Sequence, residues 1–151
     1  MKPIKKPAGI DIKVLLSTLW LFVLLNMIFR DIHEIPTPEF LEQAMAGVFN
    51  GTRVTDELLL FAGIVLELPI AMVLLSRILN YQLNRWLNIS IAFIMIGAII
   101  SNNLAPDLDD AFFAVVELIA LFCIAWQAWR WSNPIATEVD TANVVYLKEA
   151  A

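Results

Sequence analysis

Four long apolar stretches, separated by short polar segments, dominate the pattern of this sequence. They cover residues 11–30, 57–77, 86–105 and 109–131. A helix needs about 20 mainly apolar residues to cross about 30 Å of hydrocarbon, and each stretch has that length. A bilayer offers backbone groups no hydrogen-bonding partner, so each stretch is predicted to be helical. The pattern therefore predicts an all-α fold: a single-domain, polytopic membrane protein built as an antiparallel bundle of four transmembrane helices.

Residues at the ends and inside these stretches refine the prediction. Asp11, Thr55 and Asp107 precede apolar runs and are predicted N-caps, because their side-chain oxygens can accept hydrogen bonds from the first free N–H groups. Pro69 lies inside the second stretch. Its ring removes a backbone donor there, so we expect a kinked helix.

The first polar segment, about residues 31–56, has room for further structure. Thr37-Pro38-Glu39 is typical of the start of a helix. The apolar side chains that follow share one helical face: Phe40, Leu41, Ala44, Met45, Val48 and Phe49. Asn50-Gly51 is expected to end the helix. We predict a short amphipathic helix that lies on the outer membrane surface or caps the bundle.

Composition excludes several classes of protein. The chain is 60% hydrophobic and 17% charged, with a mean hydropathy of +0.73. Soluble domains are nearer ~45–50% apolar and ~25% charged, so a disordered chain, a soluble nucleic-acid binder and an ordinary cytosolic enzyme are excluded. The net charge of −5 also argues against nucleic acid as a partner.

Chemical motifs are scarce. The single cysteine, Cys123, excludes an intrachain disulfide and a cysteine-built metal site. The sequence has one His, no C-x-x-C, no Gly-rich phosphate loop and no G-x-S-x-G. We expect no metal and no cofactor.

The positive charges predict the topology. Eight of the ten Lys and Arg residues fall on one side of the predicted spans, namely Lys2, Lys5, Lys6, Lys13, Arg77, Arg85, Arg130 and Lys148, and two on the other, Arg30 and Arg53. Loops rich in Lys and Arg stay in the cytoplasm. Residues 1–10 and the tail 132–151 are therefore both predicted to be cytoplasmic.

Glu67 is the polar residue predicted to lie deepest in the membrane. An ionisable group at that depth costs about 2.5–3.5 kcal/mol on insertion scales, so it needs an explanation. Gly63 and Ala71 share its helical face. Small residues beside the acid indicate that this face contacts another helix. A neutral packing contact and a ligand, proton or ion site both remain open for Glu67.

Further polar residues are predicted in the outer third of the membrane. They are Asn26, Arg30, His33, Asn102 and Glu117. If their faces converge, they form a polar pocket that opens outward, above the level of Glu67. Arg30 is expected to pair with Glu117, either for assembly alone or for function.

Several segments together carry a resemblance. Residues 16–27 (LSTLWLFVLLNM), 67–72 (ELPIAM), 75–77 (LSR) and 84–89 (NRWLNI) resemble a family of small four-helix bacterial membrane proteins of unknown function. In size and layout the chain is more loosely similar to DoxX-like proteins. The resemblance covers about residues 10–132. It implies the four-helix topology and the bacterial cytoplasmic membrane, and it supplies no activity.

Four functions follow as hypotheses. The first is binding of a small hydrophobic or amphipathic molecule, a lipid or a quinone-like compound, in the outward-opening pocket. The second is a small proton-coupled transporter that acts as a homodimer and uses Glu67. The third is a membrane enzyme with Glu67, Glu117 and His33 as acid–base groups. The fourth is an assembly partner that uses its acidic outer face or its tail. Membrane lipid is an expected partner in each case.

Overall fold

The computed structural model describes residues 11–49, 51–103 and 108–131. These residues form five helices and one two-stranded hairpin. In chain order the elements are α1 (Ile12–Glu34), α2 (Pro38–Met45), β1 (Val48–Phe49), β2 (Thr52–Arg53), α3 (Asp56–Ile78), α4 (Tyr81–Asn102) and α5 (Leu108–Arg130). The predicted all-α fold is confirmed.

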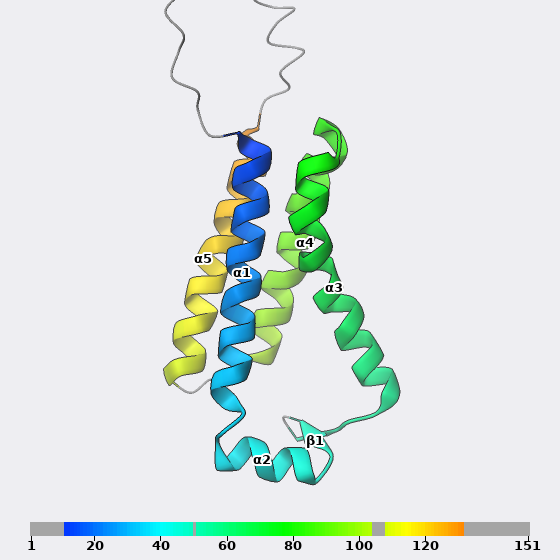
Figure 1. The fold of residues 1–151 in the computed structure, drawn as a ribbon, viewed down its shortest axis with the longest axis vertical. Helices are drawn as coiled ribbons and strands as arrows, with labels where there is room; N and C mark the ends of the chain where they lie inside the picture. Colours follow the sequence, from blue (N-terminus) through cyan, green and yellow to red (C-terminus); the bar gives the residue numbers. More distant parts are fainter. Residues whose placement is uncertain (1–10, 50, 104–107, 132–151) are drawn as a thin grey trace, which may run out of the picture.

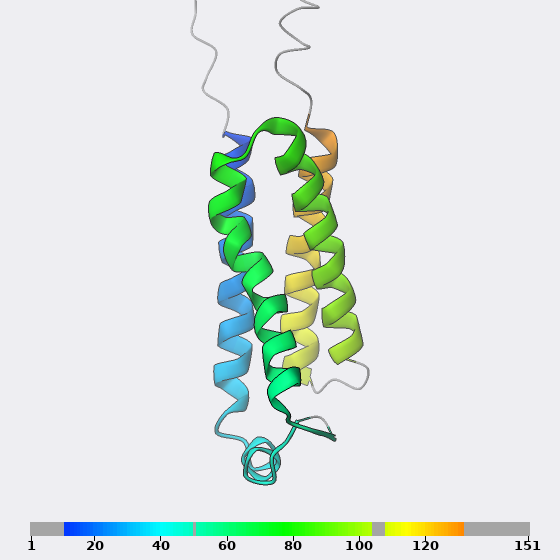
Figure 2. The same ribbon diagram turned by 90° about the vertical axis from the view of Figure 1, so that its right-hand side faces the viewer.

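The four long helices run antiparallel along one axis (Figures 1 and 2). α1, α3, α4 and α5 are each long and apolar enough to cross a membrane, as a multi-pass membrane protein requires. We call the end that carries α2 and the hairpin the α2 end, and the end where α3 passes into α4 the turn end. α1 begins and α5 finishes at the turn end (Figure 1).

The core lies mainly between α1, α4 and α5, and Met72 of α3 joins it. α1 packs against α3 and α5, and α5 also packs against α4. The large residues of the core that are almost fully buried include Leu16, Trp20, Met72, Met95, Leu121 and Ile124. On α1 the buried side chains are Leu16, Ser17, Trp20 and Val23, which share a single helical stripe.

Two of the three predicted N-caps are confirmed. The Asp11 carboxylate accepts a hydrogen bond from the Lys13 N–H at 2.9 Å. The Thr55 hydroxyl accepts one from the Leu58 N–H at 3.3 Å. Asp107 lies outside the described residues, as do segments 1–10 and 132–151.

α3 follows the bundle along only part of its length. Its buried residues are Pro69, Met72 and Ser76, all toward the turn end, whereas every residue from Asp56 to Ile64 is exposed. Figure 1 shows the N-terminal part of α3 lying away from the other long helices. Pro69 cannot donate to the Val65 carbonyl, and a missing bond of this kind allows a helix to change direction.

The predicted amphipathic helix exists but is shorter than expected. α2 begins at Pro38 with Thr37 as its N-cap, as predicted, and ends at Met45. Val48 and Phe49, which were predicted to extend the helix, instead form β1 and pair with Thr52–Arg53. The cause is local: Gly47 and Gly51 have φ of 67° and 75°, a region that glycine adopts without steric cost and that ends a helix or closes a tight hairpin.

Candidate functional site

A pocket of about 510 Å³ lies at the α2 end of the molecule. Its walls come from the end of α1, from α2, from the hairpin and from the start of α5. The lining residues are Glu34, Thr37, Glu39, Phe40, Gln43, Ala44, Gly47, Val48, Phe49, Val54, Asp109 and Asp110. Pockets of about 300–1,000 Å³ commonly hold small molecules.

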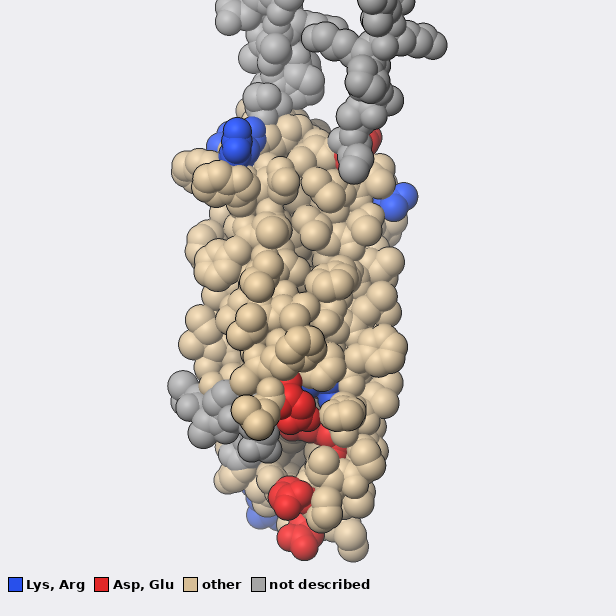
Figure 3. Space-filling view, turned by 90° about the vertical axis from the view of Figure 1, so that its left-hand side faces the viewer, with Lys and Arg blue, Asp and Glu red and all other residues tan. Residues whose placement is uncertain are grey.

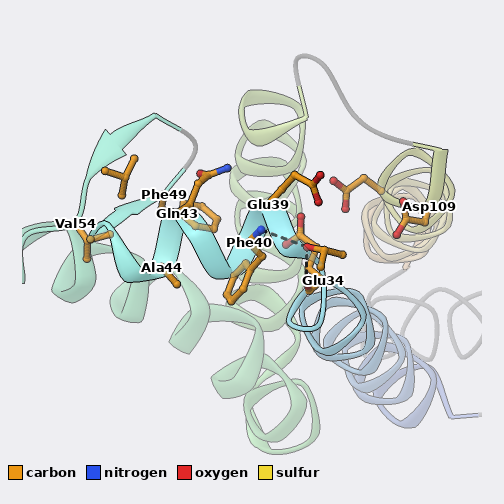
Figure 4. A pocket seen from close by; sticks show the side chains of 12 residues that line it. Glu34, Glu39, Phe40, Gln43, Ala44, Phe49, Val54 and Asp109 are labelled. Atoms are coloured by element: carbon orange, nitrogen blue, oxygen red, sulfur yellow. Dashed lines mark hydrogen bonds between the residues drawn. The ribbon is translucent and has the colours of Figure 1, made fainter.

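The lining has an acidic side and an apolar side. Glu34, Glu39 and Asp109 lie at one side of the pocket, and Phe49 and Val54 lie at the other (Figure 4). With Asp110, four carboxyl groups from three different helices meet around one space. The arrangement presents negative charge and an apolar surface to the same ligand.

Short-range hydrogen bonds fix α2 against the end of α1. The Thr37 hydroxyl donates to the Glu34 carbonyl at 2.8 Å and accepts from the Phe40 N–H at 3.3 Å. On the other side of the pocket, the Val54 N–H donates to the Gly47 carbonyl at 2.9 Å and closes the hairpin segment onto the end of α2. The sequence therefore sets both walls through one cap and one glycine turn.

Acidic groups dominate the surroundings of the pocket. Figure 3 shows Asp and Glu side chains gathered toward the α2 end of one face, while the middle of that face carries no charged side chain. The single histidine, His33, places Nε2 3.9 Å from Asp109 Oδ2. This contact is an ion pair only when the imidazole is protonated. Crowded carboxylates repel one another, so a positive group among them would be favoured.

Arg30 and Glu117 form an ion pair between α1 and α5. Arg30 Nη1 donates to Glu117 Oε2 at 3.2 Å, and the Glu117 side chain is fully buried. Within the described residues Glu117 Oε1 has no hydrogen-bond partner. Arg30 lies one helical turn from Glu34, and Glu117 lies two turns from Asp110. The pair thus joins the two helices that supply the acidic side of the pocket.

The other predicted site residues do not join this pair. Asn26 donates to the Phe22 carbonyl of its own helix at 2.8 Å, and Asn102 is exposed in the last turn of α4. Glu67 is exposed on α3 and is not among the residues that line the pocket. The sequence left open whether all these polar faces converge, and the structure brings together only Arg30 and Glu117, with His33 beside Asp109.

The described residues offer no candidate metal site. No group of three or more His, Cys, Asp or Glu side chains there is arranged to hold a metal ion. The pocket that these carboxylates line, about 510 Å³, has room for a small organic molecule.

Sequence reasoning missed a second polar cluster, near the turn end. The Asn88 amide oxygen accepts from Trp20 Nε1 at 2.7 Å and from the Ser76 hydroxyl at 3.3 Å. The Asn88 amide donates to Asn84 Oδ1 at 2.6 Å, and the Asn84 amide donates to the Ser76 carbonyl, also at 2.6 Å. These four side chains are buried and link α1, α3 and α4. Two asparagines four residues apart in an apolar stretch were the available signal.

Comparisons with known proteins supply a family and no activity. No curated protein and no solved structure matches the chain. None of the comparisons shows the looser similarity to DoxX-like proteins. The model of one protein family matches residues 9–137, nearly the whole chain, and so the protein belongs to the family of unknown function DUF6326.

Proposed function

We propose that this protein binds a small organic cation with apolar surface in the pocket at the α2 end. The observation that carries the proposal is the pocket itself. It has a volume of about 510 Å³ and is lined by four carboxyl groups and by apolar side chains. The proposal narrows the amphipathic ligand expected from the sequence to one that carries positive charge.

Each side of the pocket supports one part of this ligand. Glu34, Glu39, Asp109 and Asp110 would stabilise an ammonium group and relieve their mutual repulsion. The rings of Phe40 and Phe49 and the side chains of Val48 and Val54 would cover its apolar part. Aromatic rings also attract cations through their negative faces, especially quaternary ammonium groups.

The Arg30–Glu117 pair has a supporting role in this proposal. It fixes α1 against α5 and so keeps Glu34 beside the two aspartates that begin α5. Arg30 Nη1 forms its ion pair with Glu117 at 3.2 Å, and Arg30 Nε also lies 4.0 Å from Asp31. Both of these contacts are with acids that do not line the pocket.

The proposal places the α2 end outside the cytoplasm of a bacterial cell. Of the described Lys and Arg residues, Lys13, Arg77, Arg85 and Arg130 lie near the turn end, whereas Arg30 and Arg53 lie near the α2 end. Positive residues favour the cytoplasmic side, so the pocket would open away from it. A ligand could then enter without crossing the bilayer.

Charge-removing substitutions test the proposal with choline as the probe. We expect choline to bind the protein in nanodiscs of neutral lipid, and Glu39→Gln to weaken the binding about fivefold because one lining carboxylate is lost. Glu42→Gln is the matched control, since Glu42 belongs to the same helix and does not line the pocket. Isothermal titration calorimetry gives both affinities. Equal affinities for the two variants would contradict the proposal.

No specific observation favours the transporter or the enzyme hypothesis over binding. Glu67 is not among the lining residues of the pocket, so a proton on it has no direct contact with a ligand there. Glu117 is buried against Arg30, while His33 is exposed beside Asp109. Binding requires only the pocket.

A further inference from the structure

Glu67 lies at the middle of the second long apolar helix, on its outer surface. Eleven residues of α3 precede it and eleven follow it. At 100° per residue, Glu67 lies between about 140° and 180° around the helix from the buried residues Pro69, Met72 and Ser76. Among the described residues of the four long helices, it is the only exposed ionisable side chain more than two turns from both ends of its helix.

No group of the described chain compensates this carboxyl. Glu67 has no hydrogen-bond or ion-pair partner within the described residues. A carboxyl group left against hydrocarbon costs free energy unless it is neutralised and hydrogen-bonded. The face that carries Glu67 therefore requires a polar partner at the same depth of the membrane.

A regular stripe surrounds Glu67. Leu60, Gly63, Glu67, Ile70 and Leu74, which we call the Glu67 stripe, are separated by three, four, three and four residues, and all five are exposed. This alternation averages 3.5 residues and is the spacing at which two helices wind around each other in a left-handed pair. The stripe is thus suited to contact with another helix along four turns.

Gly63 packs closely against no other part of the chain that the structure describes. A Cβ atom placed on it would meet no atom within 4 Å. Small residues at helix–helix contacts in membranes let two backbones approach closely. The small size of Gly63 therefore serves no close contact among the described residues, and it leaves room for a neighbouring helix.

We propose that the Glu67 stripe is the interface with a second copy of this chain, formed by two α3 helices around a two-fold axis along the membrane normal. Such an axis places both Glu67 side chains at the same depth and facing each other. Two protonated carboxyl groups can donate to and accept from one another, so the second copy supplies the missing partner without any other molecule. Membrane insertion gives all copies one orientation, which makes the helix pair parallel.

Cysteine cross-linking in the bilayer tests this interface with a matched pair of positions. Leu60 and Phe61 are adjacent and each is 66% exposed, but only Leu60 belongs to the stripe. Cys123, the one native cysteine, is first replaced by Ala. We expect oxidation of Leu60→Cys to give about ten times more disulfide-linked dimer than Phe61→Cys. Both changes affect exposed side chains, and unchanged thermal unfolding verifies the fold.

Two further variants separate the interface from chance collision. Gly63→Leu, added to Leu60→Cys, should reduce the cross-linked dimer about tenfold because the helices can no longer approach closely. Glu67→Gln should retain the dimer, since an amide also donates and accepts, whereas Glu67→Leu should weaken it. Equal cross-linking at Leu60 and Phe61, no dimer from Leu60→Cys, or a Leu60→Cys disulfide to a different protein would each overturn the proposal. Choline binding by Gly63→Leu tests the pocket separately.

Discussion

A buried carboxylate such as that of Glu117 is tolerated only when a positive group lies beside it. Arg30 provides that group at 3.2 Å, and this contact was predicted from the sequence because both residues fall at the same depth of their helices. The Asn88 cluster was not predicted. Its bonds to Trp20 and Ser76 depend on how three helices are rotated about their axes, which depth along the chain does not determine.

The Arg30–Glu117 pair yields a stability prediction. Arg30→Met should lower the free energy of unfolding by about 3 kcal/mol, because it leaves the buried Glu117 unpaired. Thermal unfolding in mild detergent measures the effect, with the exposed Arg53→Met as the control. The double variant Arg30→Met, Glu117→Leu should recover most of the loss. A double variant as unstable as Arg30→Met alone would show that the pair does not act as a unit.

The Asn88 cluster yields a second prediction at this scale. Asn88→Ala removes the acceptor of Trp20 Nε1 and the donor to Asn84, and should cost about 2–3 kcal/mol because these buried groups lose their partners. Asn102→Ala is the control, since Asn102 is exposed on the same helix. Calorimetry and tryptophan fluorescence, each followed during thermal unfolding, should rank the stabilities of the two variants in the same order. Equal stability of the two variants would contradict a role for the cluster.

At the scale of elements, the periodic pattern predicted the long helices well and the α2 region only in part. The apolar spacing of Val48 and Phe49 fits the face of α2, so it favoured a longer helix. Gly47 overrides that spacing through its positive φ, and Asn50-Gly51 is a sequence typical of a tight hairpin. The pocket was missed for the same reason, because Val48, Phe49 and Val54 of its apolar lining come from the hairpin segment.

The backbone at Gly47 gives a prediction for this segment. Gly47→Ala should destabilise the hairpin by about 1 kcal/mol, because an L side chain is disfavoured at φ 67°. Hydrogen exchange of the amides in residues 51–54 should then be about fivefold faster, the Val54 amide included. The control is Gly97→Ala, which lies in α4 and whose Cβ would meet no atom within 4 Å. Unchanged exchange in Gly47→Ala would show that the turn does not hold the pocket wall.

At the scale of the whole molecule, an apolar bundle carries most of its described acids at the α2 end and most of its described positive charge near the turn end. This separation is the basis of the proposed orientation, in which the pocket lies on the side away from the cytoplasm. The overall topology could be predicted because it depends on segment length and composition. The separation of the N-terminal part of α3 from the other long helices could not, since Pro69 allows a helix to change direction without fixing where it goes.

Labelling from outside the cell tests the orientation. In a Cys123→Ala background, Ala46→Cys at the α2 end should react with a maleimide that cannot cross membranes. Gln82→Cys, exposed at the turn end, should react only after the membrane is permeabilised. Mass spectrometry or a gel shift reads the extent of labelling. The opposite pattern would place the pocket in the cytoplasm and contradict the proposed route of ligand entry.

The most direct test of the central claim compares choline with its neutral isostere, 3,3-dimethylbutan-1-ol. The two molecules have the same shape and differ in charge, so the carboxylates of the pocket should distinguish them while the apolar side should not. Titrated into the protein in nanodiscs of neutral lipid, choline should bind at least about tenfold more tightly, and added salt should reduce the difference. Equal binding of both molecules, or binding of neither, would contradict a cation-selective pocket at the α2 end.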